Sequence, residues 1–101
     1  MSNKNITQII HLDYEVFGKV QGVFFRKHTK KKADTIGLRG WVQNTTDETV
    51  KGEIQGSFEA VEKMKIWLKK EGSPKSRIDK TEFGEARTIE SYTFSDFTIL
   101  R

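Results

Sequence analysis

A nine-residue segment, Gly18 to Arg26 (GKVQGVFFR), separates a run of alternating apolar residues from a run with helical spacing. Glycine adopts backbone conformations that are closed to other residues, and it lets the chain approach a ligand closely. A junction between a strand and a helix directs free N–H groups toward one point, at the positive end of the helix. Arg26 adds a guanidinium, which binds oxyanions through two nitrogens. The segment therefore predicts a cradle for a tetrahedral anion such as phosphate.

The patterns on either side of this segment predict a two-layer α+β domain. We expect strands at 8–17, 38–44, 50–55, 78–85 and 94–100, and helices at 25–36 and 58–68. The order β-α-β-β-α-β favours a ferredoxin-like sandwich, with both helices on one face of an antiparallel sheet. The segments 78–85 and 94–100 are expected to share the last strand position or to pair as a hairpin. We assign the domain to residues 8–101 and expect the polar segment 1–7 to be frayed.

Composition excludes several classes of protein. A chain of 101 residues without cysteine is expected to form one domain with no disulfide framework, no cysteine-ligated metal and no cysteine nucleophile. We expect the cytoplasm, because the start lacks the features of a signal peptide and no apolar run approaches the length of a membrane span. The two histidines, His11 and His28, look isolated, and no carboxylates lie at ligand spacing, so we expect neither a metal nor another cofactor.

The anion cradle comes without an evident protein nucleophile. The chain has no Walker motif, no Asp-x-Asp and no Arg-His-Gly. Phosphoryl transfer still proceeds at such a site if the bond is already activated, because it needs mainly positioning and charge stabilisation. An acyl phosphate qualifies, since its leaving carboxylate has a conjugate acid with a pKa of about 4. A carboxamide could orient the attacking water. Asn44 offers one, although its position before Thr45 is equally typical of an ordinary turn residue.

Two motifs together resemble the acylphosphatase family: the Gly18–Arg26 segment and Gly40–Thr45 (GWVQNT). The stretch 72–79 (GSPKSRID) and the ending 96–101 (DFTILR) are similar as well, so that the resemblance covers 8–101. It implies a ferredoxin-like fold and metal-free hydrolysis of acyl phosphates. Phosphate binding falls to Gly18, Lys19, Val20, Gln21, Gly22, Val23 and Arg26, water orientation to Asn44, and a supporting role to Thr45. Phe24 stands where many members carry a smaller residue, often cysteine, and so thiol-based regulation is not expected.

We therefore expect a monomeric acylphosphatase that acts on small acyl phosphates and on phosphorylated aspartate in proteins, with no nucleic-acid or membrane partner. Two alternatives remain open. One is a non-catalytic module that binds phosphate or carbamoyl phosphate as a regulator. The other is a ferredoxin-like RNA-binding domain, which would need stacking aromatics on its central strands, where Val50 to Gln55 has none. The net charge of +4 fits a small anionic ligand and also weak attraction to nucleic acid.

Overall fold

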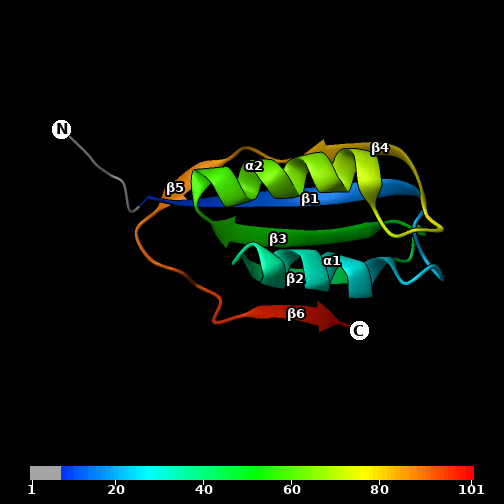
Figure 1. Ribbon diagram of the computed structural model, residues 1–101, viewed down its shortest axis with the longest axis horizontal. Helices are drawn as coiled ribbons and strands as arrows, with labels where there is room; N and C mark the ends of the chain where they lie inside the picture. Colours follow the sequence, from blue (N-terminus) through cyan, green and yellow to red (C-terminus); the bar gives the residue numbers. More distant parts are fainter. Residues whose placement is uncertain (1–7) are drawn as a thin grey trace.

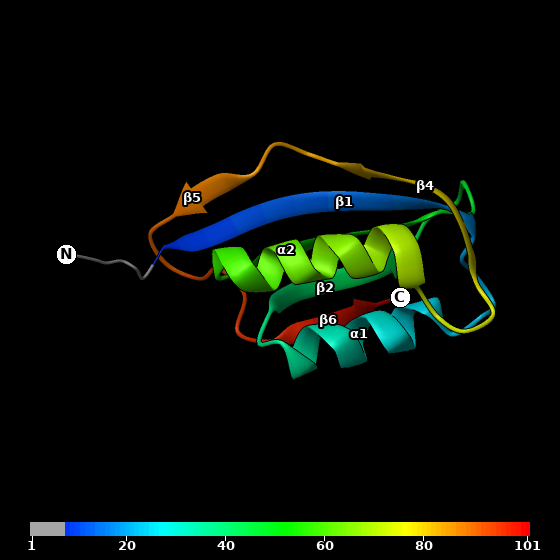
Figure 2. The same cartoon turned by 45° about the horizontal axis from the view of Figure 1, so that its top comes forward.

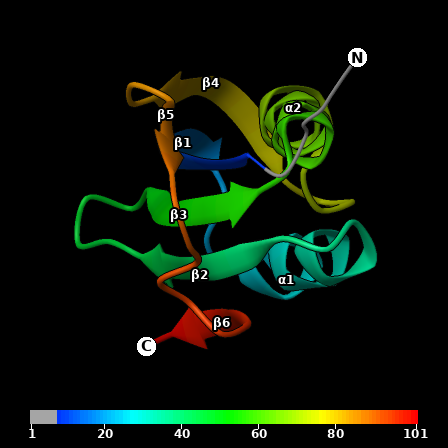
Figure 3. The same cartoon turned by 90° about the vertical axis from the view of Figure 1, so that its left-hand side faces the viewer.

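The structure, a computed structural model, describes residues 8–101 as one sheet with two helices packed against one of its faces (Figures 1 and 3). The expected frayed segment 1–7 lies outside the described residues. In chain order the elements are β1 (Ile9–Lys19), α1 (Phe25–Thr35), β2 (Arg39–Asn44), β3 (Val50–Gly56), α2 (Phe58–Ile66), the π-helical turn η1 (Trp67–Glu71), β4 (Arg77–Phe83), β5 (Arg87–Ile89) and β6 (Phe97–Leu100). The expected ferredoxin-like α+β class is confirmed.

The sheet has the strand order β4-β1-β3-β2-β6, and the short β5 pairs with the start of β1. Strands β1, β3, β2 and β4 are joined by antiparallel pairings, whereas β6 runs parallel to β2. The expectation of a wholly antiparallel sheet was therefore wrong, as was the expectation that 78–85 and 94–100 share a position or form a hairpin. After β5 the chain crosses to the opposite edge of the sheet, so that β4 and β6 lie at different edges (Figure 3).

The core lies between the sheet and the helices. The apolar members of the β1 alternation, Leu12, Tyr14 and Val16, are buried as the pattern predicts. Burial raises the pKa of Tyr14, whose hydroxyl donates to the carbonyl oxygen of Trp41 at 3.0 Å. Helix α1 packs over β2 and β6, and α2 packs over β1 and β3 (Figure 2). Neither helix has the length and apolarity needed to cross a bilayer.

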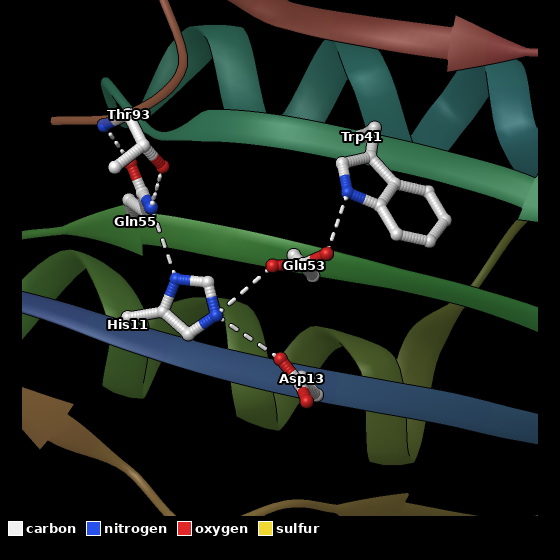
Figure 4. A network of polar contacts seen from close by, with 6 residues as sticks. All are labelled: His11, Asp13, Trp41, Glu53, Gln55 and Thr93. Carbon is white, nitrogen blue, oxygen red and sulfur yellow. Dashed lines mark hydrogen bonds and ion pairs between the residues drawn. The ribbon is translucent and has the colours of Figure 1, made fainter.

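The sheet face that carries no helix holds a network of polar side chains (Figure 4). Gln55, on β3, is buried, and its Oε1 accepts the backbone N–H of Thr93 at 3.0 Å. Its Nε2 donates to Oγ1 of Thr93 at 2.7 Å and to Nδ1 of His11 at 3.0 Å. Because the Thr93 N–H fixes the orientation of the amide, Nδ1 of His11 must accept, and the ring hydrogen lies on Nε2. Nε2 lies 3.1 Å from Oδ1 of Asp13 and 3.0 Å from Oε1 of Glu53.

We expect Gln55→Leu to destabilise the fold, because it leaves Nδ1 of the buried His11 without its partner. Each buried polar group left unpaired costs about 1–3 kcal/mol. Lys51→Leu, at an exposed position of the same strand, is the matched control and should change the free energy of unfolding by less than about 0.5 kcal/mol. Urea unfolding of both variants measures the difference. Equal midpoints for the two would show that the network contributes nothing to stability.

Candidate active site

Residues 20–24 connect the end of β1 to the start of α1 and present a series of free backbone donors. Within residues 8–101, the N–H groups of residues 21–26 donate to no other backbone group. Gly22 and Phe24 have the positive φ angles of 75° and 60°. Alternation of left-handed and right-handed residues turns successive N–H groups toward one concavity, which is an anion-binding arrangement. The free N–H groups and the two positive φ angles are compatible with the predicted anion cradle, which stays a prediction.

The loop borders a cavity of about 280 Å³ that is shared by α1, the end of β2 and the end of β6. Its lining comprises Val20, Gly22, Phe24, Phe25, Arg26, Lys27, Asn44, Ile99 and Arg101. Three of these residues are cations and none is a carboxylate or a histidine. The cavity is therefore suited to an anion and offers no base or nucleophile of its own.

Arg26 lies in the first turn of α1, where a cation is disfavoured by the helix dipole and where this helix has no acidic residue. Its Nη1 donates to the carbonyl oxygen of Leu100 at 3.5 Å, a long contact from the guanidinium to β6. One turn further along, Nζ of Lys30 donates to the carbonyl oxygen of Phe97 at 2.7 Å. Strand β6 is thereby tied to α1, and the side chain of Arg26 is held at the cavity by a strand from the far end of the chain.

Asn44 is the last residue of β2 and faces the same cavity. Its Oδ1 is buried and has no hydrogen-bond partner among residues 8–101. Buried polar atoms are nearly always paired, and an unpaired one in a cavity is a natural partner for a ligand or a water molecule. The unpaired amide oxygen of Asn44 therefore belongs to a residue that lines the same cavity as Arg26.

The turn after Asn44 is bound tightly to the loop. The side-chain Nε2 of Gln21 donates to the carbonyl oxygens of Thr45 at 2.9 Å and Thr49 at 2.8 Å. Oγ1 of Thr45 lies 2.6 Å from Oγ1 of Thr49, which donates to a carboxylate oxygen of Glu15 at 2.6 Å. These contacts connect β1, the loop and the β2–β3 turn, and they order the end of β2 that carries Asn44.

The structure brings four of the expected site residues to one cavity: Val20, Gly22, Arg26 and Asn44. The others take different places. Gly18 and Lys19 end β1 and pair with Ile78 and Arg77 of β4. A side chain at Gly18 would place Cβ 2.1 Å from the carbonyl oxygen of Arg77, so that this glycine is needed for the close pairing of strands.

The remaining expected residues support the site from outside the cavity. Gln21 binds the turn through its side chain, Val23 is buried, and Thr45 belongs to the turn. The cavity residues that sequence reasoning missed are Phe24, Phe25, Lys27, Ile99 and Arg101. The proximity of Lys27 to Arg26 in sequence was a signal for one of them. Ile99 and Arg101 gave none, because their place depends on the parallel pairing of β6.

A second group of chemically active side chains lies on the open sheet face. His11, Asp13 and Glu53 each bring a ligand-type atom within 4.8 Å of the others, which corrects the expectation of isolated histidines without carboxylates nearby. A cation here would need the lone pair of Nε2 of His11. That nitrogen carries the hydrogen and donates it to the carboxylates, as the contact with Gln55 requires. The group is complete as a hydrogen-bonded network.

The fold and the cavity together define a small ferredoxin-like protein with a cavity lined by cationic side chains. The acylphosphatase family model matches residues 12–99. Acylphosphatase-1 of Xenopus tropicalis is 54% identical over 92 residues, which are 91% of this chain and 94% of that protein. The solved acylphosphatase of Bacillus subtilis aligns with a TM-score of 0.83 at 28% identity, covering 91% of this chain and 99% of that one. The solved acylphosphatase of Coxiella burnetii aligns with a TM-score of 0.81 at 31% identity, covering 92% of this chain and 94% of that one.

The chain belongs to the acylphosphatase family. Its membership supports an enzyme that hydrolyses acyl phosphates, and it does not favour the regulatory module or the RNA-binding domain considered above. The resemblance drawn from the two sequence motifs is thereby confirmed.

We expect different outcomes when Gly18, at the end of β1, and Gly22, in the loop, are each replaced by alanine. A side chain at Gly22 meets nothing within 4 Å, and its cost is the positive φ of 75°, so Gly22→Ala should distort the loop and weaken phosphate binding about tenfold while the fold persists. Gly18→Ala should instead act chiefly on stability, because it pushes β4 away. Phosphate titration by NMR and urea unfolding separate the two effects. Wild-type phosphate affinity in Gly22→Ala would contradict the role of the loop.

Proposed function

We propose that this protein cleaves the carboxyl–phosphate bond of acyl phosphates without a metal, by attack of a water molecule that Asn44 orients. Arg26 and the backbone N–H groups of the loop between Lys19 and Arg26 hold the phosphoryl oxygens, and Thr45 supports Asn44 through the turn. The observation that carries the proposal is one cavity lined by Gly22, Arg26 and Asn44, in which the buried Oδ1 of Asn44 has no protein partner.

The chemistry requires little more than this arrangement. The water oxygen forms a bond to phosphorus as the bond between phosphorus and the acyl oxygen breaks, and the acyl group leaves as a carboxylate. No general acid is needed, because the conjugate acid of the leaving group has a pKa of about 4. The water proton passes to a phosphoryl oxygen, since no carboxylate or imidazole lines the cavity. Arg26 stabilises the charge on the phosphoryl oxygens throughout.

The proposal also covers the substrates, the partners, the oligomeric state and the compartment of the protein. Substrates are small acyl phosphates and, by the same phosphoryl end, phosphorylated aspartate in proteins. The open sheet face carries Asp13, Glu15, Glu53 and Glu82, whose charges would repel the backbone of a nucleic acid. We propose that the protein acts as a monomer in the cytoplasm, with neither nucleic-acid nor membrane partners.

We expect Arg26→Ala to lose nearly all activity together with phosphate affinity. Arg26→Lys should restore little, because an ammonium cannot contact two phosphoryl oxygens as the planar guanidinium does. The turnover number with benzoyl phosphate and the inhibition constant of inorganic phosphate measure the two effects. Lys63→Ala, on the distant helix α2, is a control for the loss of a positive charge. If Arg26→Lys keeps most of the wild-type rate and affinity, a point charge suffices and the two-nitrogen contact is wrong.

The test of the whole proposal is Asn44→Ala, assayed with benzoyl phosphate in the presence of a chelator. The wild type should remain active and be inhibited competitively by phosphate. The variant should lose about a hundredfold or more in turnover, the scale for one positioned polar group, and keep its phosphate affinity. Asn44→Asp should do no better, because its charge faces an anionic substrate.

Two results would count against this mechanism. Activity of the wild type that a chelator abolishes and one metal restores would overturn the metal-free step. A folded Asn44→Ala protein with normal turnover, or one that fails only because it no longer binds phosphate, would assign the water to another residue. Circular dichroism of each variant confirms the fold.

A further inference from the structure

Phe24 occupies a position that the fold does not explain. Its side chain is 72% exposed, whereas that of the adjacent Phe25 is 1% exposed and belongs to the core. Its backbone is left-handed, with φ 60° and ψ 27°, immediately before α1. A bulky residue is a genuine outlier in this region, where glycine or asparagine is accommodated with little strain. The protein therefore accepts both backbone strain and apolar exposure at one residue.

The side chain lies where a substrate would need an apolar surface. Phe24 lines the cavity of about 280 Å³ that also contains Arg26 and Asn44. The phosphoryl end of an acyl phosphate pairs with the cations and the loop N–H groups. An uncharged acyl end is left with the apolar members of the lining: Val20, Phe24, Phe25 and Ile99. Of these, Phe24 is the most exposed, and so it offers the most surface to a ligand.

A neighbouring cation reinforces this arrangement. Nζ of Lys27 lies 5.9 Å from the centroid of the Phe24 ring, at the outer limit of a cation–π contact. The ring thus stands beside a positive charge at the rim of the cavity. Strained residues cluster where a ligand is bound, because there the strain serves recognition.

We propose that Phe24 is a specificity-determining residue: it contacts the acyl group of the substrate and selects acyl phosphates whose acyl group is apolar and flat, aromatic ones above all. This inference rests on the proposed function. It narrows the substrate class, since the phosphoryl end is the same in every acyl phosphate and cannot discriminate between them. Aromatic rings bind one another in offset or edge-to-face geometry, which a small aliphatic acyl group cannot reproduce.

The experiment compares benzoyl phosphate with acetyl phosphate in the wild type, Phe24→Ala, Phe24→Tyr and the control Phe58→Ala. Phe58 is a similarly exposed phenylalanine, at 65%, on α2 and away from this cavity. We expect Phe24→Ala to lower the ratio of kcat/KM for benzoyl phosphate over acetyl phosphate about tenfold, chiefly through KM for benzoyl phosphate. Phe24→Tyr keeps the ring and should keep the ratio, and Phe58→Ala should leave it unchanged.

The inhibition constant of inorganic phosphate shows whether Phe24→Ala affects binding of the acyl group alone or also binding of phosphate by the loop. It should stay within about twofold of wild type in Phe24→Ala, because phosphate has no acyl group to lose. An unchanged ratio would overturn the inference. So would an equal fall for both substrates with weaker phosphate binding, since Phe24 would then merely shape the loop. A wild type that hydrolyses neither substrate would overturn the proposed function itself, and the inference with it, a result distinct from either of these.

Discussion

Two hydrogen bonds from the side chain of Gln21 set the geometry on which the site depends. They run from the middle of the loop to the carbonyl oxygens of Thr45 and Thr49 in the β2–β3 turn. The loop carries the free N–H groups, and Asn44 directly precedes the turn, so this contact fixes the separation between the loop and Asn44. Hydrolysis by an oriented water is a problem of position, in which an error of 1 Å costs about a hundredfold in rate. The side chain of Gln21 thus connects the loop to the turn that follows Asn44.

The sequence predicts those parts of the fold that local periodicity determines. The alternation through Leu12, Tyr14 and Val16 and the helical spacing of Phe25, Thr29 and Ala33 place apolar residues that the structure buries. The position of β6 follows no local pattern. Its parallel pairing with β2 is made possible by the crossing after β5, and by contacts between α1 and β6 such as that of Lys30 with Phe97. Since β6 was misplaced, Ile99 and Arg101 could not be assigned to the site, although Arg26 and Asn44 were.

The cationic cavity and the acidic pair of Asp13 and Glu53 lie in different parts of the molecule. Arg26, Lys27 and Arg101 line the cavity beside α1 and the end of β6. Asp13 and Glu53 lie with His11 on the sheet face that carries no helix. The histidine network was hidden in the sequence because Glu53 reaches Asp13 only through the register of β1 with β3, where the two are direct partners. Glu15 is the carboxylate closest in sequence to the loop between β1 and α1, and it accepts a hydrogen bond from the hydroxyl of Thr49. The potential at the cavity is thereby kept favourable for an anion.

The proposed mechanism uses no general acid, and this limits the kind of bond that can be broken in the cavity. A phosphate ester of an alcohol leaves as an alkoxide, whose conjugate acid is far weaker than a carboxylic acid, and so it needs a proton donor in the transition state. Arg26 and Arg101 cannot supply that proton, because a guanidinium does not deprotonate in a protein. They can stabilise a leaving carboxylate, which needs none. In the proposed mechanism the cations of the cavity therefore favour phosphoryl compounds whose leaving group is already stable as an anion, and discrimination among acyl groups comes from the apolar part of the lining.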